Sequence, residues 1–297
     1  VIFDEASQLY VERSIPSIAR AKKVVIAGDH KQLRPSSLGD GRFDLEDMLD
    51  EDAEISAALE EESLLDLARF RYPDVLLNTH YRSKYEELID FSNYAFYKGR
   101  LFVAPNTDKP EKPPIEVHQV TDAVWQGRAN RKEAERVVEL IKEFFATRQN
   151  NETIGVIAFN VSQRDMIYDV IDEESVKDPK FGSIVRAEMN RKDNGEDTGF
   201  FVKNIESVQG DERDVIMFSI GYAKNTSGRL IHNFGWLNQK GGENRLNVAI
   251  SRAKKKIHIV TSFRPAELML DDAKNDGPRI LKRYLEYAFA VSNNDKE

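Results

Sequence analysis

Residues 1–7 spell V-I-F-D-E-A-S, and this stretch decides how the rest of the sequence is interpreted. Apolar residues that favour an extended backbone run directly into Asp4 and Glu5. That pattern is typical of a buried strand that delivers two carboxylates at its carboxyl end. A second apolar run at residues 24–27, V-V-I-A, ends in a Gly-Asp pair. Strands of this kind that alternate with helical stretches predict a parallel α/β sheet.

The alternation of strands and helices continues along the sequence. Further strands are predicted at residues 115–120, 154–159, 202–205, 215–220 and 257–261. Helices are predicted, from apolar residues at helical spacing, at residues 63–70, 86–97, 131–145, 163–171, 243–253 and 278–290. Residues 105–114 hold four prolines and predict a loop, whereas residues 181–199 are polar and predict a long excursion from the sheet.

The domain boundary is predicted near Pro73. Residues 1–72 supply two strands and an acidic segment, which is too little for a self-contained doubly wound sheet. Residues 73–297 are enough for one domain. The expected fold class is therefore α/β, with one complete parallel-sheet domain preceded by the last part of another. The acidic segment at residues 44–62 has ten acids in nineteen residues and is interpreted as a solvated surface rather than a metal site.

The amino-acid composition excludes several classes of protein and of functional site. The 297 residues carry a formal net charge of −8, which argues against a passive nucleic-acid coat but not against a local positive groove. Cysteine is absent, so disulfides, thiol nucleophiles and cysteine-ligated metal centres are excluded within this sequence. No apolar run approaches the roughly 18 residues of a membrane span. We therefore expect no membrane partner, and a cytoplasmic location fits.

The acidic pair suits the hydrolysis of a nucleoside triphosphate. In such sites an aspartate holds Mg²⁺ and the next acid positions or deprotonates water, which assigns Asp4 to the metal and Glu5 to the water. The second strand leads into G-D-H-K-Q-L-R-P at residues 28–35. There Gly28 is expected to permit a sharp exit from the sheet, and Gln32 offers an amide for the γ-phosphate or the water. The phosphate-cradling loop G-x-x-x-x-G-K-[ST] does not occur in the sequence.

Five ordered motifs resemble those of superfamily 1 helicases. D-E-A-S and G-D-H-K-Q-L-R-P are similar to motifs II and III, and the H-K-Q-L-x-P form is closest to the branch that contains the nonsense-mediated-decay RNA helicase and its bacterial relatives. The other matches are T-H-Y-R-S at 79–83, I-E-S-V-Q-G-D-E-R-D-V-I at 205–216 (motif V) and R-L-N-V-A-I-S-R-A-K at 245–254 (motif VI). The resemblance implies the end of a first RecA-like motor domain joined to a second, complete RecA-like P-loop motor domain.

The resemblance also places two arginines at the nucleotide. Arg82 lies in the T-H-Y-R-S motif and Arg252 in motif VI. A planar, permanently charged guanidinium suits the neutralisation of charge that spreads over phosphate oxygens. Arg252 is expected to be the arginine finger and Arg82 to support the γ-phosphate, so that both, with Gln32, contact ATP and take part in catalysis. The alternative is that each is an ordinary surface or salt-bridge arginine.

Motif V and one strand end supply further candidates. Gly210 lets the backbone approach a ligand closely, and the resemblance implies that Glu212 accepts a hydrogen bond from the ribose of ATP. By the same resemblance, Ser207 and Asn160 are the candidate contacts to nucleic acid. Polar residues in a tight turn or at a strand end need no ligand, so the simpler structural interpretation stays open.

The activity implied by the resemblance is that of an ATP-dependent, Mg²⁺-requiring motor. It would move 5′ to 3′ along single-stranded nucleic acid, with DNA preferred and RNA as the alternative. ATP would bind between this chain and the missing N-terminal part of its own motor, so the chain alone is expected to be inactive. Two alternatives from other classes are a docking or nucleic-acid-binding module without catalysis, and a P-loop ATPase regulator that does not unwind.

Two patterns remain outside the motifs or at their edge. Residues 254–256 are three consecutive lysines, interpreted as a solvated face with nucleic-acid contact as the alternative. The five histidines show no metal-ligand spacing, and two of them belong to the motifs. The other three, interpreted as structural, are His118, His232 and His258.

Overall fold

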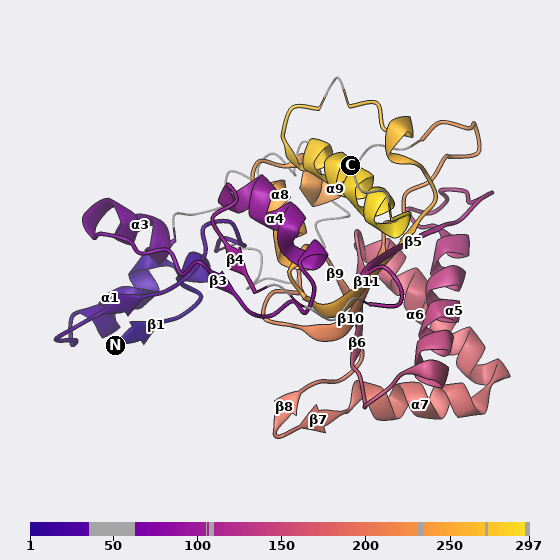
Figure 1. Cartoon of the computed structure of the whole chain (residues 1–297), viewed down its shortest axis with the longest axis horizontal. Helices are drawn as coiled ribbons and strands as arrows, with labels where there is room; N and C mark the ends of the chain where they lie inside the picture. The colour runs from indigo at the N-terminus through magenta and orange to yellow at the C-terminus, as the bar shows by residue number, and fades with distance from the viewer. Residues whose placement is uncertain (36–62, 105, 107–109, 231–233, 271–272, 295–297) are drawn as a thin grey trace.

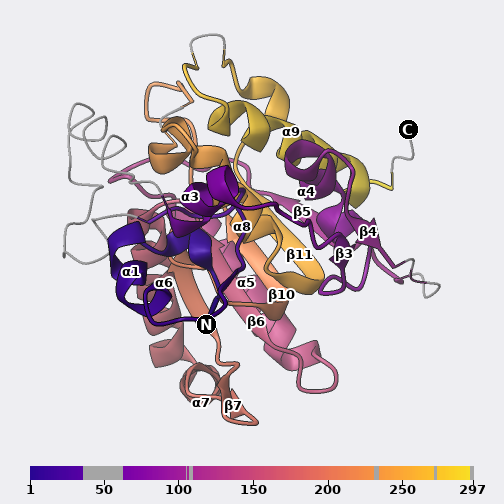
Figure 2. The same cartoon turned by 90° about the vertical axis from the view of Figure 1, so that its left-hand side faces the viewer.

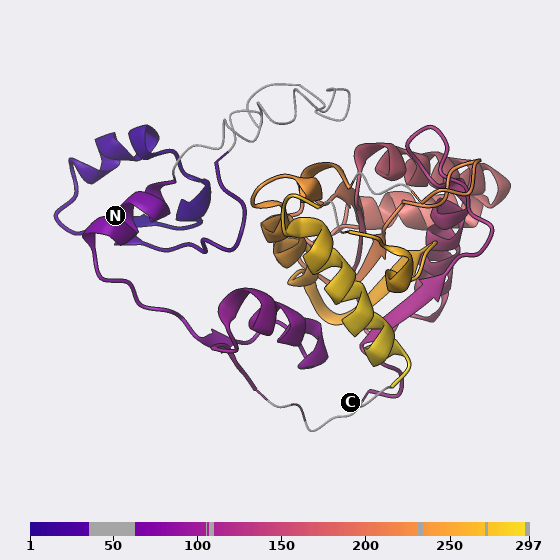
Figure 3. The same ribbon diagram turned by 90° about the horizontal axis from the view of Figure 1, so that it is seen from above.

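The computed structural model describes residues 1–35, 63–104, 106, 110–230, 234–270 and 273–294. It consists of a small N-terminal unit beside a larger sheet unit (Figure 1). Seen from above, the two units are separate lobes (Figure 3). The acidic segment at residues 44–62 lies outside the described residues. Within them, no helix is long and apolar enough to cross a membrane.

The N-terminal unit is built on two short parallel strands, β1 (Ile2–Phe3) and β2 (Val25–Ile26). Both lie where the sequence predicts strands, although each spans only two residues. The 3₁₀ helix η1 (Ala6–Gln8) and the helices α1 (Val11–Ile18) and α3 (Leu64–Arg71) pack around them. Their apolar contacts form a small core around three buried residues, Ala6, Leu64 and Leu65.

Close packing explains the glycine that follows β2. A Cβ atom on Gly28 would lie 3.0 Å from the backbone nitrogens of both Ala6 and Ser7. The backbone of Gly28 is not among those with a positive φ, so the conformational freedom expected there from the sequence is not used. Gly28 instead lets the chain after β2 lie against the D-E-A-S stretch after β1.

Five parallel strands form the sheet unit, in the order β5-β11-β10-β6-β9. Their bounds are Ile115–Gln119 (β5), Ile154–Ala158 (β6), Phe201–Asn204 (β9), Arg213–Ser219 (β10) and Ala253–Thr261 (β11). All five residues of β6 are buried, as expected for a central parallel strand that is covered on both faces. The predicted α/β class with a parallel sheet is therefore confirmed.

Helices cover both faces of this sheet (Figure 2). On one face lie α4 (Glu87–Tyr97), α8 (Gly242–Ile250) and α9 (Gly277–Ser292). On the other lie α5 (Arg131–Thr147), α6 (Val161–Lys177) and α7 (Pro179–Met189). The shorter elements are β3 (Thr79–His80) paired with β4 (Phe102–Val103), η4 (Gly235–Asn238) and η5 (Pro265–Glu267).

The predicted excursion at residues 181–199 is wrong. Most of it is regular structure, namely α7 followed by a small hairpin of β7 (Lys192–Asp193) and β8 (Glu196–Asp197). Asp178 caps α7 by accepting hydrogen bonds from two backbone N–H groups, and a proline follows in the first turn. The hairpin turns on Asn194-Gly195, both with positive φ, which is the strongest short-range hairpin signal in a sequence. These two local signals outweigh the polarity of the segment, which alone predicts a loop.

The chain passes from the N-terminal unit to the sheet unit between α3 and α4. α3 packs on the N-terminal unit, whereas α4 packs on the sheet unit. These contacts agree with a boundary near Pro73, but the division into residues 1–72 and 73–297 stays a prediction.

Candidate active site

The acidic pair lies directly after β1, where the sequence places it. Glu5 adopts a left-handed backbone with φ 49° and caps η1, and its N–H donates to Oδ1 of Asp4 at 2.9 Å. Both side chains are exposed. Holding a residue other than glycine in this conformation costs about 1–3 kcal/mol, and such strained residues are concentrated at functional sites. The turn therefore holds two accessible carboxylates in a conformation that the sequence alone does not favour.

The segment after β2 is organised by Asp29. The backbone N–H of Lys31 and the side-chain amide of Gln32 both donate to the Asp29 carboxylate, at 2.8 and 3.2 Å. The hydroxyl of Tyr97, from α4 of the sheet unit, donates to the same carboxylate at 2.6 Å. Burial, with the nearby Asp29, raises the pKa of Tyr97 well above its ordinary value, so the hydroxyl keeps its proton. Asp29 thus fixes Gln32 and joins the two units.

Two further side chains of the sheet unit reach across to the N-terminal unit. Asn247, on α8, donates to the carbonyl of Lys31 and to the Tyr97 hydroxyl, both at 2.8 Å. Gln209 accepts from the backbone N–H of Leu33 at 3.3 Å and donates to Oε2 of Glu5 at 2.9 Å. The acidic pair and motif V therefore meet at this junction.

Arg82 lies on the sheet-unit side of the junction. Its Nε donates to Oε2 of Glu212 at 2.6 Å, and Nη1 lies 3.4 Å from the carbonyl of Ser251. Glu212 also pairs with Lys254 at 2.7 Å. The two cations hold the pKa of Glu212 below its ordinary value, against the effect of its partial burial. In this structure Glu212 is the counter-ion of Arg82 and Lys254, and its contact with a ribose stays a prediction.

Arg252 differs from Arg82 because its charge has no carboxylate partner among the described residues. The residue is 4% exposed, and its guanidinium donates to two backbone carbonyls, of Val248 and Asp211, and to the Ser251 hydroxyl. No carboxylate among the described residues lies within ion-pair distance of it. Burial and the neighbouring Arg82 lower the pKa of Arg252 to about 10, while Glu5 acts in the opposite direction. The guanidinium stays charged at pH 7 and is held in a place that favours an incoming anion.

The remaining sequence candidates are spread along motif V and the carboxyl end of β6. Gly210 has φ 87° and open space where a Cβ would stand. Ser207 is exposed and donates to the side chain of Asn204 at 2.7 Å. Asn160 caps α6 through its Oδ1, while its buried Nδ2 has no hydrogen-bond partner among the described residues. Within the described part of the chain, Ser207 and Asn160 make no hydrogen bond to the acidic pair or the arginines, so their roles stay predictions.

The lysine run of residues 254–256 lies inside β11, which begins four residues before the predicted strand at 257–261. Each lysine pairs with at least one carboxylate, namely Glu212 for Lys254, Glu152 and Asp214 for Lys255, and Glu116 for Lys256. The run is therefore neither an unpaired solvated face nor free for nucleic acid in this structure.

Three residues of the junction are not predicted by the sequence patterns, namely Asp29, Tyr97 and Asn247. Asp29 carries a signal, since it follows the second strand as Asp4 follows the first. Tyr97 and Asn247 carry none, because each meets the N-terminal unit only in the folded chain, 68 residues from Asp29 and 216 residues from Lys31 respectively.

Fold and site together place the chain in the class of RecA-like α/β motor domains. A protein-family profile described as an AAA domain matches residues 60–264. The chain belongs to this family, which is a family of superfamily 1 helicases. The resemblance seen in the five motifs is thereby confirmed.

Similar proteins carry helicase names. The chain is 39% identical over 300 residues to an uncharacterized ATP-dependent helicase of Mycoplasma pneumoniae, covering all of this chain and 26% of that protein. It is 25% identical over 277 residues to a regulator of nonsense transcripts 1 homolog from Neurospora crassa, covering 88% of this chain and 22% of that protein. The chain therefore spans about a quarter of the length of these curated relatives. A solved structure described as the C-terminal domain of a possible DNA helicase from Lactobacillus covers 66% of this chain and 96% of its own chain. The TM-score is 0.34 and the identity 15%, so no argument rests on this match.

Proposed function

We propose that this chain is part of an ATP-dependent superfamily 1 helicase or translocase that moves 5′ to 3′ along single-stranded nucleic acid, with DNA as its substrate and RNA as the alternative. The main observation behind the proposal concerns Arg252, whose buried guanidinium lies at the junction and is influenced by Glu5. No carboxylate among the described residues lies within ion-pair distance of this guanidinium. The relatives' names, which include ATP-dependent helicases, support the nucleotide and the activity. A cytoplasmic location stays a prediction.

The nucleotide is proposed to bind at the junction of the two units. Asp4 offers an exposed hard-oxygen ligand, which fits Mg²⁺, and bound Mg²⁺ would neutralise charge on the phosphate oxygens. Arg252 and Arg82 would do the same from the sheet unit, since phosphoryl transfer is catalysed mainly by positioning and electrostatic stabilisation. Glu5 would take a proton from the attacking water, and Gln32, fixed by Asp29, would orient that water or the γ-phosphate.

The roles of motif V follow from its position at the junction. Gly210 would let its backbone approach the nucleotide, and Glu212 would exchange its present ion pairs for the ribose. Ser207 and Asn160 would contact the nucleic-acid strand. The unpartnered Nδ2 of Asn160 supports its part of the proposal, because a buried donor without an acceptor costs free energy that a phosphate oxygen would restore.

The chain alone is expected neither to bind ATP tightly nor to hydrolyse it. Its 297 residues contain no phosphate-cradling loop, and backbone N–H groups and a lysine are what such loops contribute. Isothermal titration of this chain with Mg²⁺–ATP, with a phosphate-release assay, measures both properties. Low-micromolar binding, or turnover stimulated by single-stranded DNA, would contradict this expectation.

The central experiment uses the longer protein that contains this segment and compares Glu5→Gln with wild type. Loss of a general base costs about 10²–10⁴-fold in turnover, whereas the isosteric amide should leave ATP binding in place. Turnover within a few-fold of wild type would remove Glu5 from the water-activating role. Displacement of a labelled strand from DNA and RNA substrates with 5′ or 3′ overhangs tests direction and substrate. ATP turnover without displacement would favour the regulator alternative, and nucleic-acid binding without turnover would favour the binding module.

A further inference from the structure

Three potential metal ligands converge at the edge of the sheet that β5 and β11 form. They are Oε2 of Glu116, Nε2 of His118 and Nδ1 of His258. The distances are 3.0 Å between the two imidazole nitrogens, 3.5 Å from His258 to Glu116 and 4.0 Å from His118 to Glu116. No spacing pattern in the sequence indicates this group, since the histidines lie 140 residues apart. The interpretation of both as merely structural is therefore incomplete, while His232 lies outside the described residues.

The three distances fit a small divalent cation. A point equidistant from three atoms separated by 3.0, 3.5 and 4.0 Å lies about 2.1 Å from each of them, by the geometry of the triangle. Zinc–imidazole bonds are about 2.0–2.1 Å and zinc–carboxylate bonds about 2.0–2.2 Å. The three distances therefore leave room for a metal ion among these atoms.

Parallel strand pairing produces this arrangement. Glu116 lies opposite His258 in the register of β5 and β11, and His118 lies opposite Val260, two residues further along. Residues two apart on a strand point to the same face, so all three side chains share one face of the sheet. β5 is the edge strand, so a metal here would tie the edge of the sheet to the strand next to it.

Charges around the group both oppose and permit a cation. Lys256 pairs with Oε1 of Glu116 at 2.7 Å, which leaves Oε2 directed at the histidines. The positive charge of Arg136 on α5 also acts on the histidines and opposes a cation there, but Arg136 is paired with Glu139 and Glu143. Burial lowers the pKa of both imidazoles below the ordinary value.

We infer that Glu116, His118 and His258 form a binding site for a divalent transition-metal cation of the zinc type. Two imidazoles and one carboxylate are a common protein ligand set for Zn²⁺, and they leave a fourth position for water. The site is independent of the proposed nucleotide chemistry, which uses oxygen ligands around Mg²⁺ at the junction. Its expected role is to stabilise the edge of the sheet.

The test uses tag-free protein of this chain, stripped with a chelator and titrated with Co²⁺ as a spectroscopic probe. We expect visible d–d absorption that saturates at one equivalent and is displaced by Zn²⁺. Added Zn²⁺ should also raise the melting temperature, since a ligand that binds only the folded state stabilises it. The absence of a cobalt spectrum at one equivalent would overturn the inference.

Variants separate this site from adventitious binding. His258→Ala and Glu116→Gln should each weaken Co²⁺ binding by about tenfold or more, since even outer-shell changes cost 10–100-fold. His80→Ala, which removes an imidazole outside the group, is the matched control and should leave the titration unchanged. Glu116→Gln keeps the size of its side chain, so its result stands even if His258→Ala disturbs folding. Undiminished binding in Glu116→Gln would assign the metal elsewhere and overturn the inference.

Discussion

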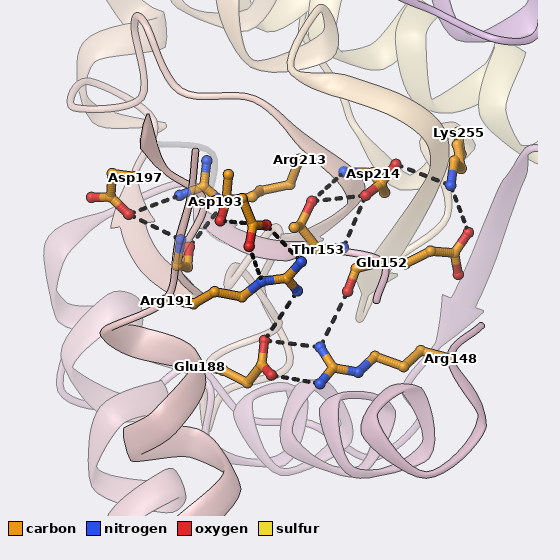
Figure 4. Close-up of polar contacts among 12 residues, drawn as sticks. Arg148, Glu152, Thr153, Glu188, Arg191, Asp193, Asp197, Arg213, Asp214 and Lys255 are labelled. Carbon is orange, nitrogen blue, oxygen red and sulfur yellow. Dashed lines mark hydrogen bonds and ion pairs between the residues drawn. The ribbon is translucent and has the colours of Figure 1, made fainter. Parts of the chain in front are cut away.

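Two clusters of charge lie at the amino ends of the central strands, and they are balanced in opposite ways. The closed cluster ties the ends of α5 and α7 to the starts of β6, β10 and β11 (Figure 4). It has five carboxylates for four cations, namely Glu152, Glu188, Asp193, Asp197 and Asp214 with Arg148, Arg191, Arg213 and Lys255. The open cluster has one carboxylate for three cations, namely Glu212 with Arg82, Lys254 and Arg252.

The difference indicates what each cluster is for. In the closed cluster every cation has a carboxylate within ion-pair distance, and an anion would find no unmatched charge among these residues. In the open cluster Arg252 is buried, and within the part of the chain that the structure describes its hydrogen bonds go to neutral oxygens. A buried charge without a counter-ion is costly, and no carboxylate among the described residues lies within ion-pair distance of Arg252. We therefore propose that the closed cluster stabilises the fold and that the open cluster binds an anion.

The largest expected effect therefore belongs to Arg252. Arg252→Ala in the longer protein should lower kcat for ATP hydrolysis by about 10³-fold or more, as expected of an arginine finger, with a smaller change in ATP affinity. Arg252→Lys should restore little, because a point charge does not reproduce the planar guanidinium. Steady-state turnover and nucleotide titration measure both. If turnover is unchanged while the melting temperature of this chain falls, Arg252 is a structural residue and the comparison of the clusters fails.

Arg148 offers the matched change in the closed cluster. It forms a two-point ion pair with Glu188, and both side chains are largely buried. Arg148→Ala should lower the free energy of unfolding by about 1–3 kcal/mol, the range for hydrogen bonds to charged groups, and leave turnover unchanged. Urea unfolding of this chain measures the first quantity. A tenfold loss of turnover at unchanged stability would show that the closed cluster is not merely structural.

The sequence predicted the sheet better than its surroundings. Strands such as β6 and β10 are continuous apolar runs because both faces are covered, and that pattern is local. α7 and its hairpin were missed because their polar residues face solvent or the closed cluster, although Asp178 and Asn194-Gly195 carried local signals. Arg82 and Arg252 were found through their motifs, but the pairing of Glu212 and the isolation of Arg252 depend on contacts between distant segments.

A buried carboxyl group on the carboxyl side of the sheet, Glu133, offers a contrast with Arg252. Glu133 is fully buried, and it accepts hydrogen bonds from Ser219, Gly221, Ser262 and Asn130 rather than from a cation among the described residues. Burial raises its pKa from 4.5 to about 8, against the effect of these donors. Glu133 therefore avoids a buried charge by keeping its proton at pH 7. An arginine cannot become neutral in this way, because its guanidinium stays protonated.

This predicts a dependence of stability on pH. Between the ordinary pKa of 4.5 and the folded pKa of about 8, the folded state binds more protons at Glu133 than the unfolded state. The free energy of unfolding should therefore fall as pH rises through that interval. From pH 5 to 8 we expect a loss of about 5 °C in melting temperature, and a smaller loss in Glu133→Gln, which does not titrate. Asp90, whose pKa burial raises to about 6, keeps part of the slope in both proteins. Identical slopes would show that Glu133 is ionised and held by its donors.

The smallest effect is expected at the hydrogen bonds that join the two units. The Tyr97 hydroxyl donates to Asp29 and accepts from Asn247, so it links both units around Gln32. Tyr97→Phe removes about 1 kcal/mol of hydrogen bonding, which corresponds to roughly five-fold in a rate if the contact is kept in the transition state.

Tyr287→Phe is the control, because that hydroxyl donates at 2.9 Å to the carbonyl of Glu87, within the sheet unit. We expect Tyr97→Phe in the longer protein to lower turnover a few-fold with little change in melting temperature, and Tyr287→Phe to do the reverse. Equal turnover in the two variants would mean that the position of Asp29 and Gln32 does not depend on α4, and that the open cluster works without this link.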